Sequence, residues 1–268
     1  MEVTPASAPS PSGDPTATAG SGLRQAWELL GEAAERRSLA WRRLAEAFHG
    51  PDGGWVADLL DGTLQADLDR AVSWLDSDQE LYQAPLERLQ RFVDTQTGRD
   101  PHEVELDLAV EHARLFVGPE RVPAPPYESV WTDTDPMSGR PVIHGPSTDS
   151  VEAAYAEQGV GIAEDYHDLP DHVATEAEFV CYLCEREAEA WRQGLPEDAK
   201  ALRAAQQQFL TAHLGRFAGE FCDAVDRAAP GDCYGAFVGL LRAHLTIETG
   251  TPYLEVVGSV WSSAPHPS

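Results

Sequence analysis

The spacing of apolar residues constrains the fold of this chain most, because they recur at intervals of three and four over most of its length. The first run begins at Leu23, passes through Trp41 and ends before His49-Gly50-Pro51. This spacing places apolar side chains on one face of an α-helix, and the Gly-Pro pair stops it. No segment alternates apolar and polar residues between hairpin turns, so no sheet is expected. The sequence therefore predicts an all-α helical bundle of about eight to ten helices.

Stop and start signals divide the bundle into its helices. Asp100 can cap a helix that has Pro101 at its first position, and Gly194 ends another helix. Between Pro196 and Val225 the apolar spacing continues without a stop, which predicts a single helix there. The predicted helices cover residues 23–48, 55–60, 64–75, 86–93, 101–115, 148–158, 172–193, 196–225 and 234–248, and residues 253–261 are expected to pack in extended form.

A long proline-rich segment separates the two helical halves. Residues 117–149 contain seven prolines and no sustained apolar period. Because the segment also carries Tyr127, Val130 and Trp131, we expect it to be ordered against the body and to act as a hinge. The chain then divides into a disordered tail (1–22), an N-terminal half (23–116), the hinge (117–149) and a C-terminal half (150–260) of one domain (23–260). A hinge of this length would allow a domain-swapped homodimer.

The charge of the chain excludes two classes of partner. Acidic residues number 45 against 19 basic ones, which gives a formal net charge of −26. Such a surface repels phosphate backbones and anionic membranes, and it attracts basic peptides. The same acidity also fits general solubility or a saline cytoplasm. The start of the chain lacks a basic region and an apolar run, and no stretch is long enough to span a bilayer, so we expect a cytoplasmic protein.

Residue types that could carry catalysis form no complete pattern. Cys181 and Cys184 have C-x-x-C spacing, but they lie within a predicted helix on its apolar side, which indicates buried thiols. His172 and Glu176 are one helical turn apart, as metal ligands on a helix can be, but a second such pair is missing. The single lysine, Lys200, is in no phosphate-binding loop. We therefore predict neither an enzyme nor a bound cofactor or metal.

Three segments carry a resemblance to a known family. They are LFVGPERVPAPPYESVW at 115–131, PDH at 170–172 with Glu176 and Phe179, and FLTAHL at 209–214 with Phe217 and Phe221. Together they resemble the TorD/DmsD/NarJ group of cytoplasmic chaperones, on its TorD/DmsD side. The resemblance implies a protein that binds the twin-arginine signal peptide and/or the apo form of a molybdopterin oxidoreductase catalytic subunit, its client, and holds the client until its cofactor is inserted.

The resemblance also implies a set of peptide-binding residues. Asp171 and His172 are candidates to contact the peptide, although from the residues alone Asp171 is equally a cap for the helix that follows it. Glu128 and Asp171 are the best candidates to meet guanidinium groups of the client. The full set of candidates is Asp171, His172, Pro125, Pro126, Tyr127, Glu128, Ser129 and Arg114.

Two other functions stay open at this point. One is a helical-bundle metalloenzyme that uses Glu and His ligands, which tightly bound metal in the purified protein would indicate. The other is a NarJ-like assembly factor for a client that is not exported, which would bind the body of the enzyme and ignore signal peptides.

Overall fold

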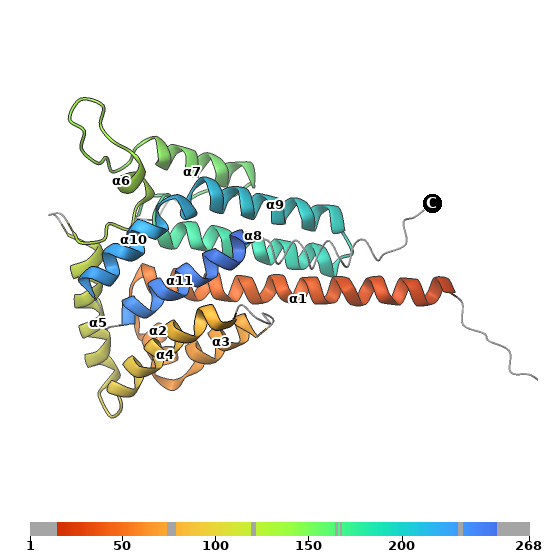
Figure 1. The fold of residues 1–268 in the computed structure, drawn as a ribbon, viewed down its shortest axis with the longest axis horizontal. Helices are drawn as coiled ribbons and strands as arrows, with labels where there is room; N and C mark the ends of the chain where they lie inside the picture. The colour runs from red at the N-terminus through yellow and green to blue at the C-terminus, as the bar shows by residue number, and fades with distance from the viewer. Residues whose placement is uncertain are drawn as a thin grey trace, which may run out of the picture.

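A computed structural model describes residues 15–73, 79–118, 122–163, 166, 168–229 and 233–250. Within these ranges the chain forms eleven α-helices and no strand, so the all-α prediction is confirmed (Figure 1). None of the described helices has the length and apolarity that crossing a membrane requires. The helices are α1 (Pro15–His49), α2 (Gly53–Asp61), α3 (Thr63–Val72), α4 (Glu80–Thr95), α5 (Pro101–Phe116), α6 (Glu128–Thr132), α7 (Pro146–Glu157), α8 (Val173–Arg192), α9 (Pro196–Ala212), α10 (Leu214–Ala228) and α11 (Cys233–Thr249).

Most helix boundaries follow the sequence signals. Asp100 accepts a hydrogen bond from the backbone N–H of His102 and Pro101 occupies the first turn of α5, as predicted. Helix α1 begins at Pro15, inside the segment predicted as a disordered tail. Residues 1–14 and the predicted extended segment 253–261 lie outside the described residues.

The single helix predicted between Pro196 and Val225 is wrong, because the chain breaks at His213 into α9 and α10. His213 has φ −128° and ψ −98°, which is not helical. At Gly215 an added Cβ would lie 2.5 Å from the carbonyl oxygen of Leu210, so glycine permits the close return of the chain. Both helices bury apolar faces on the same side, and the apolar period therefore runs through the break.

Both predicted halves contribute to one interior. Helix α1 packs along α8, α8 packs on α9, and α11 packs on α4 (Figure 1). One cluster of buried apolar side chains extends from Trp41 in α1 to Ile247 in α11. Each large apolar side chain removed from water contributes roughly 1.5–3 kcal/mol. The predicted division into two halves with exchange between protomers stays a prediction.

The proline-rich segment has local structure of its own. It contains the short helix α6 and the first turn of α7. The backbone N–H of Ala124 donates to the carbonyl of Leu115 (3.1 Å), and the indole N–H of Trp131 donates to the carbonyl of Pro125 (2.7 Å). Residues 122–132 are therefore fixed to the end of α5 and to one another. Residues 119–121 lie outside the described ranges, and the role of the segment as a hinge stays a prediction.

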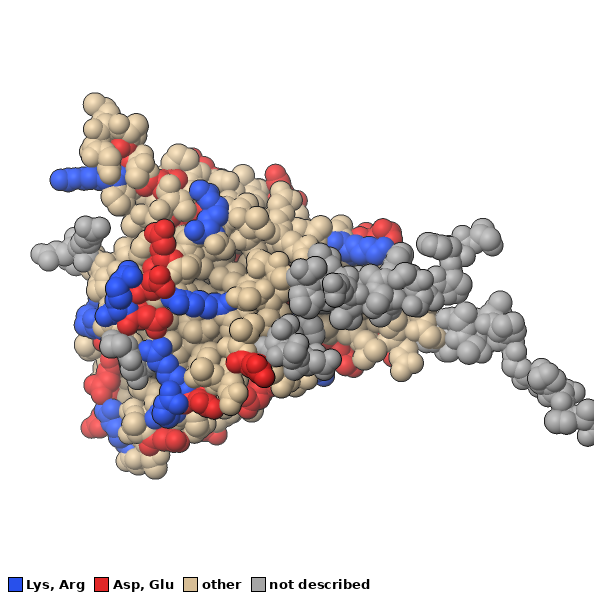
Figure 2. All heavy atoms as spheres, in the orientation of Figure 1, with Lys and Arg blue, Asp and Glu red and all other residues tan. Residues whose placement is uncertain are grey.

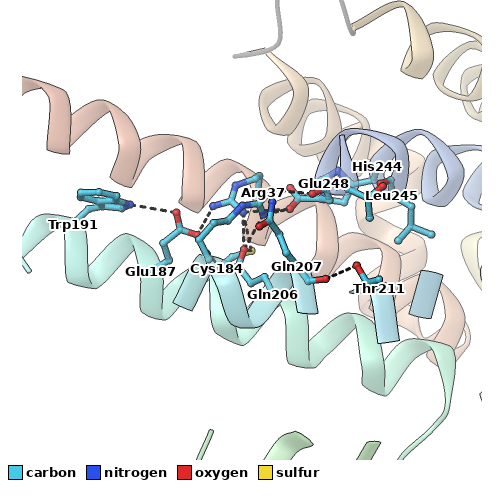
Figure 3. A network of polar contacts seen from close by, with 12 residues as sticks. Arg37, Cys184, Glu187, Trp191, Gln206, Gln207, Thr211, His244, Leu245 and Glu248 are labelled. Carbon is cyan, nitrogen blue, oxygen red and sulfur yellow. Dashed lines mark hydrogen bonds and ion pairs between the residues drawn. The ribbon is translucent and has the colours of Figure 1, made fainter. Parts of the chain in front are cut away.

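A buried network of charged side chains joins four helices (Figure 3). Arg37 of α1 donates to Glu187 of α8 (2.5 Å), to Glu248 of α11 (3.3 Å) and to Gln206 of α9 (2.7 Å). Arg203 of α9 forms a second ion pair with Glu248. Burial alone would raise the pKa of Glu248, but Arg203 and Arg37 outweigh this effect and lower that pKa to about 2. Glu248 therefore stays ionised at neutral pH.

The four cysteines are buried and form no disulfide, which confirms the prediction for Cys181 and Cys184. Burial raises the pKa of Cys181 and of Cys222 to about 12. These two thiols therefore remain protonated and unreactive at neutral pH.

Candidate functional site

Two segments that lie far apart in the sequence are joined by backbone hydrogen bonds. The N–H of Glu128 donates to the carbonyl of Asp171 (2.9 Å), and the N–H of Val173 donates to the carbonyl of Pro126 (2.7 Å). Between them, Tyr127 and His172 form an isolated antiparallel bridge. This pairing brings together all the candidate residues except Arg114. The APPYES and PDH motifs therefore form one structural unit, the paired segment (residues 125–129 and 170–173).

Asp171 caps a helix, but not the one expected from the sequence. Its side chain is fully buried, and its Oδ2 accepts a hydrogen bond from the backbone N–H of Ser129 (2.8 Å), in the first turn of α6. The N-cap of α8 is instead His172, whose Nδ1 accepts from the N–H of Ala174 (3.1 Å). The prediction that Asp171 caps its own helix is therefore wrong, because its carboxylate faces a helix formed by residues 42 positions earlier.

We expect the Asp171→Ala substitution to lower the free energy of unfolding by about 1–3 kcal/mol, because it removes a cap and leaves the buried N–H of Ser129 without an acceptor. Asp171→Asn keeps an acceptor oxygen and should melt close to the parent protein. Thermal and urea unfolding of both variants test this. Equal losses in the two variants would show that the charge of Asp171, rather than its hydrogen bond, stabilises the paired segment.

Asp168 organises the exposed side of the paired segment, and sequence reasoning missed it. Its carboxylate accepts from the hydroxyl of Tyr127 (2.7 Å) and lies 3.7 Å from Nε2 of His172. Burial and Asp168 both raise the pKa of Tyr127, which stays a hydrogen-bond donor. Burial lowers the pKa of His172 to about 4 and outweighs the opposing effect of Asp168. His172 is therefore neutral at pH 7, which its role as an acceptor for Ala174 requires.

Glu128 connects the paired segment to the break between α9 and α10. Its side chain is fully buried. Oε2 lies 3.0 Å from Nδ1 of His213, and Oε1 accepts from Nη1 of Arg216 (3.0 Å). Sequence reasoning missed His213 and Arg216 because it expected an unbroken helix there. Glu128 is thus an ion-pair partner within the fold, and its contact with a client arginine stays a prediction.

A groove lies between the paired segment, α6 and α10. It is open to solvent and has a volume of about 1060 Å³. Of the candidate residues, Pro125 and Tyr127 line it. Arg114 does not; its guanidinium contacts Glu111 and the carbonyl of Ala228 (3.1 Å). The lining residues are Phe116, Val117, Gly118, Val122, Pro123, Pro125, Tyr127, Val130, Trp131, Arg140, Pro141, Ile143, Glu220, Ala224 and Arg227.

The charge around the groove is mixed. Figure 2 shows arginine side chains interspersed with acidic ones over the end of the molecule formed by α4, α5 and α10. Arg140, Arg227 and Glu220 contribute charges of both signs to the groove itself. The net charge of −26 is therefore not concentrated in the groove, and its walls are mainly apolar.

The pair His172 and Glu176 does not form the metal site considered from the sequence. His172 uses Nδ1 as a helix cap, and Glu176 is fully buried without a hydrogen-bond partner for either oxygen. Burial raises the pKa of Glu176 well above its usual range, and Glu128 and Asp171 raise it further. Among the residues that the structure describes, no three His, Cys, Asp or Glu side chains are placed to hold a metal ion.

Comparisons with known proteins match this part of the chain. The model of the nitrate reductase delta subunit family matches residues 75–223, which include both motifs of the paired segment, α6 and most of α10. The chain is 39% identical over 87 residues to a selenate reductase assembly chaperone of Thauera selenatis, which covers 31% of this chain and 43% of that protein. It is 25% identical over 147 residues to the chaperone TorD of Vibrio cholerae, covering 55% of this chain and 61% of TorD.

A chlorate reductase assembly chaperone of Ideonella dechloratans is 37% identical over 62 residues, which cover 23% of this chain and 31% of that protein. In each of these comparisons the chain spans less than two thirds of the length of its relative. The family model nevertheless covers more than half of the chain and includes the segments on which the resemblance rests. The chain therefore belongs to the nitrate reductase delta subunit family, and with it to the TorD/DmsD/NarJ type of protein that its sequence resembles.

Proposed function

We propose that this protein is a cytoplasmic chaperone that binds the twin-arginine signal peptide of a molybdopterin oxidoreductase and assists assembly of that enzyme before export. The observation that carries the proposal is the groove, because residues of the first motif shared with the family line it, and backbone hydrogen bonds pair this motif with the second. The names of the relatives as assembly chaperones for selenate and chlorate reductases support a reductase as the client.

The size and lining of the groove suit a short peptide. Pockets for small ligands measure roughly 300–1,000 Å³, and this groove reaches about 1060 Å³. Phe116, Pro125 and Trp131 give it apolar walls, and Val117 and Ile143 are 60% and 57% exposed at its edges. A signal peptide brings an apolar segment and two adjacent arginines. The apolar segment would lie against these walls, as in other helix-in-groove complexes.

The test compares a groove substitution with a matched one elsewhere. We expect Ile143→Gln to weaken binding of a twin-arginine signal peptide on the order of three- to tenfold, because it removes part of the apolar surface that the peptide covers. Leu29→Gln is the control, since Leu29 is 61% exposed on α1 and outside the groove; its affinity should equal that of the parent. Titration calorimetry gives both affinities.

Two outcomes would contradict the proposal. No binding of the signal peptide, together with binding of the folded enzyme body, would indicate an assembly factor that ignores the signal. Equal weakening by Ile143→Gln and Leu29→Gln would show that the peptide binds outside the groove.

A further inference from the structure

Helix α10 carries both groove-lining residues and Arg216, the partner of the buried carboxylate of Glu128. Glu220, Ala224 and Arg227 of α10 line the groove. Residues spaced by three or four positions lie on the same face of a helix, and Arg216 precedes Glu220 by one turn. Glu128 belongs to α6, which packs on α10, and the neighbouring α6 residues Val130 and Trp131 line the groove. The Glu128–Arg216 pair therefore joins the two helices that line the groove, one turn of α10 away from Glu220, although neither residue lines the groove itself.

The two side chains of the Glu128–Arg216 pair differ strongly in their exposure to solvent. The carboxylate of Glu128 is fully buried, whereas the side chain of Arg216 is 48% exposed. Arg216 reaches Glu128 through Nη1 alone (3.0 Å), and the same nitrogen is 3.4 Å from the carbonyl of Ala212. Arginine and carboxylate pair most strongly through two parallel hydrogen bonds. Arg216 thus covers a buried carboxylate from the solvent side with only part of its hydrogen-bonding capacity.

We propose that Glu128 is the subsite for one arginine of the client peptide and that Arg216 is an internal occupant which the client arginine replaces. This inference rests on the proposed function. The exchange of one guanidinium for another keeps Glu128 paired at every stage, so it avoids the large cost of leaving a buried carboxylate without a cation. A lysine fits the exchange less well, because its ammonium group lacks the planar fork.

The other carboxylates in or near the paired segment are not available for this exchange. Asp171 is fully buried and accepts from the N–H of Ser129 (2.8 Å). Glu176 is fully buried in α8, and Asp168 holds the hydroxyl of Tyr127 (2.7 Å). Of the buried carboxylates in the paired segment, Glu128 alone is covered by an arginine of the groove-lining helix.

Removal of the internal occupant should therefore strengthen binding. We expect Arg216→Ala to bind a twin-arginine peptide on the order of tenfold more tightly than the parent, because the subsite no longer has to be vacated. For a peptide in which two lysines replace the arginines, the Arg216→Ala substitution should increase the affinity only slightly. Arg216→Lys keeps a cation that pairs less well with Glu128, so its affinity should lie between those of the parent and Arg216→Ala, and Glu128→Gln should reduce the preference for arginine over lysine. Binding of the twin-arginine peptide by the parent tests the proposed function. The ratio of the affinity of Arg216→Ala to that of the parent tests the exchange.

A second measurement needs no client. Arg216→Ala leaves Glu128 with His213 alone, so its melting temperature should fall, and N-ethylguanidinium should restore part of the loss. Ethylammonium at the same concentration should restore less, and neither ion should stabilise the parent. The exchange is overturned if the two cations act equally on Arg216→Ala, or if this variant binds the twin-arginine peptide no more tightly than the parent.

Discussion

Replacing Arg37 with methionine should lower the free energy of unfolding by about 3–5 kcal/mol, which is the usual cost of breaking a buried ion pair from one side. The guanidinium of Arg37 is fully buried between Glu187 and Glu248, whose side chains are also without exposure. Methionine fills similar space but leaves Glu187 without its cation and Glu248 with Arg203 alone. Urea unfolding followed by tryptophan fluorescence measures the loss.

The matched control for Arg37 lies on the same helix. Arg42 of α1 pairs with Glu185 of α8, but the two side chains are 52% and 47% exposed. Exposed pairs contribute about 0–1 kcal/mol, so Arg42→Met should change stability little. Similar losses in both variants would mean that stability depends on the aliphatic packing of α1 on α8 and not on the buried charges.

The second large effect is a loss of stability in mild acid. Burial lowers the pKa of His172 and of His244 from 6.5 to about 4. Each imidazole is therefore neutral in the folded state but binds a proton in the unfolded state between pH 6.5 and pH 4. Because the unfolded state binds more protons in this window, stability is present above pH 6.5 and falls as the pH drops to about 4. Each histidine contributes up to about 3 kcal/mol of this loss.

Variants that cannot titrate isolate the contribution of each histidine. His172→Asn keeps a helix cap, and His244→Gln removes the imidazole whose Nδ1 lies 2.6 Å from the hydroxyl of Tyr82. In each variant the difference in unfolding free energy between pH 7 and pH 4 should be smaller than in the parent. An unchanged difference in both variants would assign the acid loss to other groups.

Glu176 acts in the opposite direction over part of the same range. Its pKa is raised by burial, so the folded state holds a proton that the unfolded state releases above its ordinary pKa of 4.5. Glu176 therefore stabilises the folded state below pH 4.5, and this contribution is lost as the pH rises through the raised pKa of the folded state. Glu176 therefore offsets part of the histidine loss, whereas Glu248, with its pKa lowered to about 2, adds to the loss below pH 4.5. The variant differences measure the histidines more directly than the total does.

Local signals predicted the helices well where they were strong. The Asp100-Pro101 start and the stop after His49 are defined by residues next to each other in the chain, and the structure confirms both. The break at His213 could not be predicted in this way. Its physical cause is the close approach of Gly215 to the carbonyl of Leu210, and the apolar spacing on either side of it is unchanged.

The sequence predicted which residues of the candidate site lie together better than it predicted what each of them does. The motif residues 125–129 and 171–172 do lie together, because backbone hydrogen bonds join them. The role of Asp171 as a cap for α6 depends on a partner 42 residues away, and no local pattern reveals it. Arg216 and His213 could not be found either, since their importance comes from their contacts with Glu128 across the fold.

The position of Arg37 also determines when this protein can finish folding during its own synthesis. Its partners Glu187 and Glu248 follow it by 150 and 211 residues. Helix α1 therefore leaves the ribosome with a charge whose acidic partners, on α8 and α11, emerge much later. A nascent chain that ends before α11 has an incomplete network around Arg37 and exposes the apolar face on which Trp41 lies. Contacts of such long sequence separation also slow folding, so we expect the newly made chain to be prone to aggregation until α11 is complete.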